Sequence, residues 1–91
     1  MAKYMIQDSH EVADCVRVLD EFLRAGAHYL TNADWGCEDG DHTAWIMVEA
    51  DSDEEARLMV PPIIRKRARP VRLNRFTPVQ IRGFHQQDLG R

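Results

Sequence analysis

The dipeptide Asp39-Gly40 lies between two runs of aromatic and β-branched residues, and it limits the possible folds more than any other feature. A two-residue type I′ turn needs a positive φ at both central positions, and Asp-Gly tolerates this conformation well. The sequence therefore predicts a tight β-hairpin in which Cys37 lies opposite His42. Trp35 would lie opposite Ala44 on the same face, because side chains alternate along a strand. The hairpin would thus gather two metal-type ligands and an aromatic ring.

Apolar periodicity and helix-capping residues predict the element order βαββαβ, followed by a short C-terminal helix. Strands are expected at residues 2–7, 27–37, 42–50 and 70–76, and Val71 and Leu73 of the last strand are expected to face the core. Helices are expected between Asp8 and Gly26, from Asp53 to Pro61-Pro62, and at residues 79–86.

The first helix has the clearest boundaries in the sequence. Asp8 or Ser9 would cap it, and Glu11 would complete a capping box with Asp8. Gly26 is suited to end it, because glycine adopts the left-handed conformation without strain. Its core-facing stripe is predicted from the apolar residues at helical spacing, which are Val12, Cys15, Val16, Leu19, Phe22 and Leu23.

This element order is that of the ferredoxin-like fold, an α+β domain with an antiparallel four-stranded sheet and two helices on one face. The domain would occupy residues 1–86, and residues 87–91 would form a flexible tail. The third predicted strand is apolar on both sides, with Ile46 on one face and Trp45 and Met47 on the other. Helices would cover the first face. We expect a homodimer to cover the second, because monomers rarely expose large apolar patches.

Four short segments carry a resemblance to a known superfamily: Asp34-Trp35-Gly36-Cys37, Gly40-Asp41-His42-Thr43, Val60-Pro61-Pro62 and Arg75-Phe76-Thr77-Pro78. With the element order, they resemble a group of short bacterial proteins in the dimeric α+β barrel superfamily. Muconolactone isomerases, cofactor-independent monooxygenases and short nickel-binding proteins belong to this superfamily. The resemblance implies two sheets packed face to face in a dimer, often with a ligand cleft between sheet and helices. It implies no catalytic residue, because the chemistries of the superfamily differ.

Topology predicts which side chains meet at the end of the sheet where the first strand finishes. Cys37 and His42 would lie there, joined by Cys15 and His10 from the start of the first helix. Thiolates and imidazoles suit zinc, nickel or copper, so these four residues are candidate ligands of a divalent transition metal. The alternative is that both cysteines are buried thiols without a metal. His28 would start the second strand at the opposite end.

The leading functional hypothesis is a small anionic or aromatic ligand bound in the cleft between sheet and helices. His42 would anchor the ligand or move a proton, and Trp35 would form a wall. Arg65 or Arg67 would supply a counter-charge. Whether such a protein acts as an isomerase or a cofactor-independent oxygenase stays open. Metal binding through Cys37 and His42 is the first alternative, and a protein-interaction module without a small ligand is the second.

Composition narrows the function classes further. Residues 1–55 carry 14 of the 15 acidic groups and residues 56–91 carry nine of the 12 basic groups, so the halves have opposite charge. They would neutralise each other or leave an arginine-rich anion site. The nucleophile elbow, the phosphate-binding glycine loop and the ribonucleoprotein strand pattern are missing, which argues against those enzymes and against nucleic-acid binding. Without an apolar run of membrane-span length, and with two cysteines, we expect a cytoplasmic protein with reduced thiols and no membrane partner.

Overall fold

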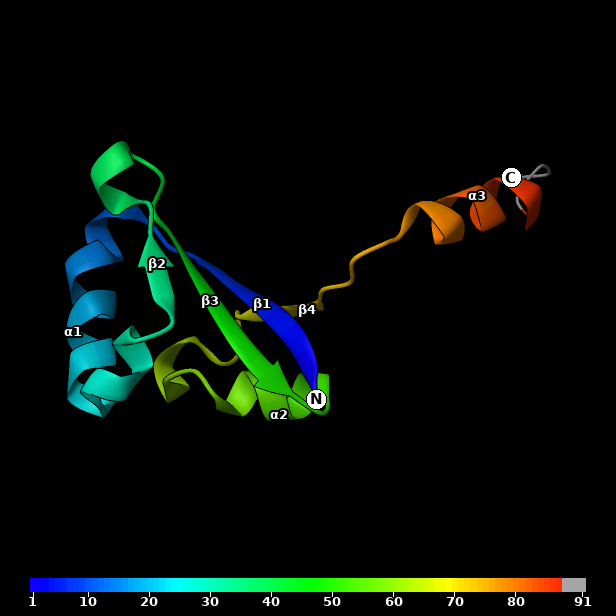
Figure 1. Ribbon diagram of the computed structural model, residues 1–91. Coiled ribbons are helices and arrows are strands. Elements are labelled where there is room, and N and C mark those ends of the chain that lie inside the picture. Colours follow the sequence, from blue (N-terminus) through cyan, green and yellow to red (C-terminus); the bar gives the residue numbers. More distant parts are fainter. Residues whose placement is uncertain (88–91) are drawn as a thin grey trace.

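The computed structural model describes residues 1–87 and shows an α+β domain built on an open, four-stranded antiparallel sheet (Figure 1). The strand order is β2-β3-β1-β4, and each neighbouring pair is antiparallel. The strands are β1 (Ala2–Ser9), β2 (Ala33–Trp35), β3 (Thr43–Ala50) and β4 (Arg69–Arg72). The helices are α1 (Cys15–Ala25), α2 (Asp53–Leu58) and α3 (Pro78–Gln87). This arrangement is compatible with the predicted ferredoxin-like fold.

The core lies between one face of the sheet and the helices α1 and α2. β1 pairs with β3 along its whole length, from Ala2 opposite Ala50 to Ser9 opposite Thr43. This register places the even-numbered residues of both strands on the helix-covered face, because side chains alternate along a strand. The buried residues of the core are Tyr4, Ile6, Val18, Phe22, Ala44, Ile46, Ala50, Ala56, Val60, Ile64 and Ala68.

The predicted core-facing stripe of α1 is wrong in part. β1 continues through Asp8 and Ser9, so neither residue caps the helix. A 3-10 turn at Val12–Asp14 then precedes α1 and changes which of its residues face the sheet. Val18 is fully buried, whereas Val16 is 69% exposed, and Val12 and Leu23 are exposed as well. The prediction failed because the helix was assumed to start directly after Asp8 or Ser9, five or six residues before its first residue, Cys15.

Gly26 ends α1, as the sequence predicts. Its φ is 148°, and its amide donates to the Phe22 carbonyl. The residues that follow were expected to form the start of a strand, but they form a 3-10 turn at Ala27–Leu30. β2 is therefore confined to Ala33–Trp35 instead of residues 27–37.

In the second half of the domain, α2 begins at the predicted residue, whereas the last strand is shorter than predicted. The Ser52 hydroxyl accepts a hydrogen bond from the Glu55 amide at 3.1 Å, which caps α2. β4 covers Arg69–Arg72 rather than residues 70–76. Val71 pairs with Met5 on the sheet face that α1 and α2 leave open, so the core position expected for it is wrong.

α3 stands apart from the sheet at the end of an extended segment (Figure 1). Its first turn is capped by Thr77, whose hydroxyl accepts a hydrogen bond from the Gln80 amide at 3.2 Å. The Gln80 side chain accepts in return from the Thr77 amide at 2.8 Å. The predicted helix at 79–86 is therefore confirmed, with one further residue at each end.

Of the predicted tail at 87–91, residues 88–91 lie outside the described part of the chain. Within residues 1–87, none of the helices is both long enough and apolar enough to cross a membrane.

Candidate metal centre

The loop between β2 and β3 is longer than the predicted two-residue turn. Trp35 pairs with Ala44 as predicted, but a 3-10 turn at Cys37–Asp39 follows. Gly40 takes a positive φ of 84°, whereas a type I′ turn would need a positive φ at Asp39 as well. The predicted turn type is therefore wrong, while the register of the two strands is confirmed.

Gly36 and Asp41 close this loop. The Gly36 amide donates to the Thr43 carbonyl, and the Gly36 carbonyl accepts from the amides of Asp39 and Asp41, each at 3.0 Å. A Cβ atom on Gly36 would lie 2.6 Å from the Asp41 carbonyl oxygen, so a larger residue would force the backbone to shift. The Thr43 hydroxyl donates to the Asp41 carboxylate at 2.7 Å. The closed loop carries Cys37 away from the strand pair and toward α1.

Four side chains meet where β1 ends, α1 begins and the loop closes. They are His10, Cys15, Cys37 and His42, and one nitrogen or sulfur atom of each lies within 4.8 Å of those of the others. The Cys15 thiol donates to the Cys37 sulfur at 2.9 Å, and that sulfur lies 3.8 Å from His10 Nε2. Cys15 is buried, and Cys37 and His42 are half-buried; His10 is half-buried as a whole residue, although its side chain has no exposed surface. Both cysteines are free. The structure thus brings together all four residues that the sequence proposes as metal ligands.

His10 is held against a buried carboxylate. The side chains of His10 and Asp8 have no exposed surface, and His10 Nδ1 lies 3.5 Å from Asp8 Oδ2. Asp8 also accepts hydrogen bonds from Nε and Nη2 of Arg67. Hydrogen bonding to Asp8 raises the pKa of Arg67, so the guanidinium stays charged and compensates the buried carboxylate.

The two histidines of the cluster are tied together by their main chains. The His10 amide donates to the His42 carbonyl at 2.9 Å, and the ring centroids lie 6.1 Å apart. The Nδ1 atoms of both rings are buried and make no hydrogen bond. A buried polar atom without a partner costs about 1–3 kcal/mol. A metal ion bound to the cluster would give His42 Nδ1 a partner, whereas His10 Nδ1 faces the Asp8 carboxylate at 3.5 Å.

Burial and the hydrogen bond with Cys15 raise the pKa of Cys37 from 9.0 to about 11. In the absence of a cation, this thiol is therefore protonated at neutral pH, and nucleophilic thiolate chemistry is disfavoured. A bound metal ion reverses this balance, because it stabilises the thiolate directly. The surroundings of Cys37 thus suit a metal ligand better than an activated nucleophile.

Trp35 lies against the inner side of the cluster. Its ring centroid is 6.2 Å from that of His10 and 4.9 Å from that of Phe22, which it contacts edge to face. Phe22 is fully buried in the core. These aromatic rings keep water away from one side of the cluster, and charged interactions are stronger where water is excluded.

The two arginines predicted as counter-charges lie in different places. Arg67 reaches the surroundings of the cluster through Asp8. Arg65 donates instead to the carbonyls of Val60 and Leu58, at 2.9 and 3.1 Å. Arg65 therefore satisfies main-chain acceptors at the end of α2 and is not brought to the cluster, because the carbonyls at a helix end need donors.

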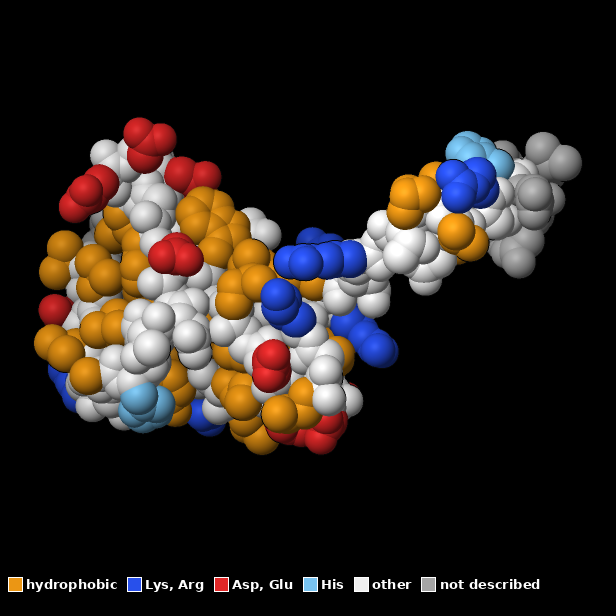
Figure 2. All heavy atoms as spheres, in the orientation of Figure 1, with side chains coloured by type: hydrophobic (Ala, Val, Ile, Leu, Met, Phe, Trp, Pro, Cys, Tyr) orange, Lys and Arg blue, Asp and Glu red, His pale blue; other side chains and the backbone are white. Residues whose placement is uncertain are grey.

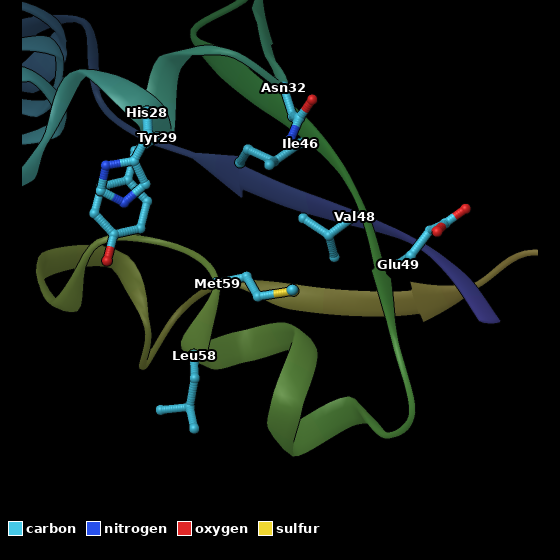
Figure 3. Close-up of a pocket in the computed structure, with 8 residues that line it drawn as sticks. All are labelled: His28, Tyr29, Asn32, Ile46, Val48, Glu49, Leu58 and Met59. Carbon is cyan, nitrogen blue, oxygen red and sulfur yellow. The ribbon is translucent and has the colours of Figure 1, made fainter. Parts of the chain in front are cut away.

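His28 lies at the opposite end of α1 from the cluster and lines a separate hollow of about 340 Å³ (Figure 3). The rings of His28 and Tyr29 lie 4.2 Å apart, centroid to centroid. The other lining residues come from the turn before β2, from β3 and from the end of α2: Asn32, Ile46, Val48, Glu49, Leu58 and Met59. A hollow between sheet and helices thus exists, but it is not beside His42.

Asp8 is the residue of the site that the sequence prediction missed, since it was assigned as a helix cap. The alternation of Tyr4, Ile6 and Asp8 could have found it, because a strand repeats its buried face every second residue. A carboxylate on that face needs a partner. The Arg67 guanidinium supplies the counter-charge to Asp8, and His10, two residues after Asp8 in the sequence, lies next to the same carboxylate.

Comparison with protein-family models, with curated proteins and with solved structures gives no match for this chain. The resemblance to the dimeric α+β barrel superfamily therefore rests on the short segments and the element order, with which the strand order of the sheet is compatible. The function of the protein has to be inferred from its own side chains.

Proposed function

We propose that this protein binds a divalent transition metal ion, zinc in the first place, through His10, Cys15, Cys37 and His42. One observation carries the proposal: donor atoms from three separate chain segments all lie within 4.8 Å of one another. In a tetrahedral zinc site with bonds of about 2.0–2.3 Å, neighbouring donors lie about 3.3–3.8 Å apart. Small side-chain rotations would therefore let the four residues surround an ion.

The donor set favours zinc among the transition metals. Two thiolates and two imidazoles are a common ligand set of structural zinc sites, which are tetrahedral. Nickel and copper bind the same atoms, and copper binds most sites more tightly than zinc does. The identity of the ion is therefore best measured on protein as it is purified from cells.

A structural role follows from the number of ligands, because four protein ligands leave no open position for a substrate. The ion would join the end of β1 to the start of α1 and to the loop before β3. A chain of 91 residues has room for only a modest core. Metal binding would therefore contribute directly to the stability of the fold.

Asp8 and Arg67 support the proposal from outside the ligand set. Metal-bound histidines commonly donate their second ring N–H to a carboxylate, which fixes the ring orientation and the tautomer. Asp8 faces His10 Nδ1, which leaves His10 Nε2 on the side of the Cys37 sulfur. The Nδ1 atom of His42, buried without a hydrogen bond, would gain the ion as its partner.

Metal analysis of protein purified without an affinity tag tests this function. We expect about one zinc ion per chain, with a fall in Tm on chelation and recovery when zinc is added. The variants H10A, C15S, C37S and H42A should each weaken zinc binding by about 100-fold or more, because each removes a ligand. His28→Ala is the matched control and should bind zinc normally. The proposal fails if no saturable zinc binding occurs, or if His28→Ala loses as much affinity as His42→Ala.

The hollow beside His28 favours a second function, the binding of a small aromatic or anionic molecule (Figure 3). Ile46 and Val48 give it an apolar floor, and the His28 imidazole offers a hydrogen-bond donor. A screen of small aromatic acids by NMR would test it. Binding should be lost in His28→Ala and kept in His42→Ala, the reverse of the zinc result. Equal binding by both variants would contradict the use of this hollow.

A further inference from the structure

The two cysteines of the proposed metal site lie closer together than two thiolates on one zinc ion. The Cys15 thiol donates to the Cys37 sulfur at 2.9 Å. Two sulfurs in a tetrahedral site with bonds of about 2.3 Å would lie about 3.8 Å apart, whereas the sulfurs of a disulfide lie about 2.05 Å apart. The observed separation falls between these values, so the pair is close to both arrangements.

A bond between these sulfurs would join the same two segments as the metal ion. Cys15 is the first residue of α1, and Cys37 begins the 3-10 turn of the loop before β3. The two residues are 22 positions apart in the sequence, so a disulfide would close a loop of the chain and restrict the unfolded state. The helix and the loop would therefore stay together after the ion has left.

The two thiols differ in their access to solvent. Cys15 is 8% exposed, whereas Cys37 is half-buried. An oxidant would therefore reach Cys37 first, and Cys15 would serve as the resolving thiol beside it. Redox-sensing cysteines are often placed next to such a partner, and oxidants attack their thiolate form. A bound zinc ion would hold both sulfurs as thiolates.

Acidic side chains lie on the loop that carries Cys37. Glu38, Asp39 and Asp41 are exposed, and Figure 2 shows acidic side chains gathered over this loop. A negative surface attracts a divalent cation and repels anions over a distance of about 8–10 Å in physiological salt. Glutathione disulfide is an anion, whereas hydrogen peroxide is small and neutral. The charge of the loop therefore favours peroxide as the oxidant.

We propose that Cys15 and Cys37 form a reversible disulfide with hydrogen peroxide as the oxidant, and that this disulfide and the metal ion exclude each other. The inference rests on the proposed metal-binding function, because it describes how the same site releases its ion. Oxidation removes two of the four ligands. The ion is then left with the imidazoles of His10 and His42 alone.

The oxidation proceeds in two steps. The Cys37 thiolate attacks one oxygen of the peroxide, the O–O bond breaks, and a sulfenic acid and a hydroxide ion form. The Cys15 sulfur then attacks the Cys37 sulfur, so that the S–S bond forms, the S–O bond breaks and a second hydroxide ion leaves. Both hydroxide ions take a proton from solvent. Two thiolates thus supply two electrons, and one peroxide becomes two water molecules.

Treatment of the zinc-loaded protein with hydrogen peroxide tests the exclusion. We expect one zinc ion to appear on a chromogenic indicator for every two thiols lost, and zinc affinity to fall at least about 1,000-fold because two ligands are gone. The chain should lose the mass of two hydrogen atoms. Trypsin digestion should give residues 4–17 linked to residues 25–57, the two fragments that contain the cysteines. A phosphine reductant and added zinc should restore the loaded protein.

Two variants separate the disulfide from metal binding. Metal-free His42→Ala keeps both thiols and should form the same disulfide, more slowly because no ion holds the thiolates. Cys15→Ser removes the resolving thiol, so peroxide should carry Cys37 to the sulfinic acid, a gain of two oxygen atoms. The oxidised wild type should have a higher Tm than the reduced metal-free wild type, and peroxide should give no such rise in Cys15→Ser.

The two proposals fail in different ways. Zinc that binds the reduced protein and stays bound after both thiols are lost would overturn the exclusion and leave the metal-binding function intact. Sulfinic acid at Cys37 of the wild type, without a disulfide, would do the same. A reduced protein that binds no zinc would overturn the metal-binding function and the exclusion with it.

Discussion

His10 Nδ1 lies 3.5 Å from the carboxylate of Asp8, while His10 Nε2 lies 3.8 Å from the sulfur of Cys37. One imidazole thus connects a buried anion to the thiol pair. Arg67 compensates the anion from the other side, so the order is guanidinium, carboxylate, imidazole and thiol. Such outer carboxylates orient metal-bound histidines and raise their basicity.

The first prediction concerns Asp8. Asp8→Asn keeps the shape of the side chain but removes its charge, so it should lower zinc affinity by about 10–100-fold. The number of ions bound per chain should not change. A competition titration against a chromogenic chelator measures the affinity. Asp34→Asn, which neutralises an exposed carboxylate on β2, is the control and should bind zinc as wild type does. Wild-type affinity in Asp8→Asn would mean that the carboxylate does not act on the metal site.

The two arginines predicted as counter-charges should differ in their effects. Arg67→Ala leaves the Asp8 carboxylate buried without a counter-charge and should destabilise the fold by about 2–3 kcal/mol. This cost is smaller than that of breaking a fully buried ion pair, because the Arg67 side chain is 39% exposed. Arg65→Ala removes two hydrogen bonds at the end of α2 and should cost about 1–2 kcal/mol. Of these two variants, only Arg67→Ala should have a lower zinc affinity than wild type. Urea denaturation and zinc titration of both variants check this, and equal zinc affinities would contradict it.

The raised pKa of Cys37 makes the metal-free protein sensitive to alkaline pH. Its thiol ionises near 9.0 in the unfolded chain and at about 11 in the folded one. Because the pKa of this thiol is higher in the folded chain than in the unfolded chain, the thiol stabilises the fold at pH values below 9.0. This stabilisation is lost as the pH rises toward about 11. Urea denaturation of metal-free protein between these pH values should therefore show falling stability. Cys37→Ser should flatten this dependence, and identical slopes in the two proteins would count against the buried thiol.

Gly36 should be necessary for the geometry of the loop. A methyl group at Gly36 would meet the Asp41 carbonyl oxygen at 2.6 Å and the Trp45 ring at 3.0 Å. Gly36→Ala should therefore move the loop, destabilise the fold by about 1–3 kcal/mol and weaken zinc binding through Cys37. Gly83→Ala is the control, because nothing lies within 4 Å of a Cβ atom there. Thermal unfolding with and without zinc checks both variants, and wild-type zinc binding in Gly36→Ala would contradict this role of the loop.

The sequence predicted the element order and the four clustered residues because both follow from local patterns and chain direction. The pairing of Trp35 with Ala44 was predicted from the Asp-Gly motif, although the loop between the two strands is longer than the predicted two-residue turn. Topology alone predicted that four side chains would meet, because the direction of each strand and helix determines which segment ends lie together. These side chains are His10, Cys15, Cys37 and His42.

What the sequence could not supply were the side-chain pairings over long separations. Asp8 looked like a helix cap because its local pattern fits a capping box, whereas its partner Arg67 lies 59 residues away. Val71 was expected in the core because it is apolar in a strand. The face it occupies is set by its pairing with Met5, which no local pattern fixes.

X-ray absorption at the zinc edge, measured on the purified and fully loaded protein, tests the metal site most directly. It should find two sulfur atoms at about 2.3 Å and two nitrogen atoms at about 2.0–2.1 Å from the ion. Cys37→Ser should lose one of the two sulfurs. A first shell made of oxygen and nitrogen alone, without sulfur, would contradict the proposed site.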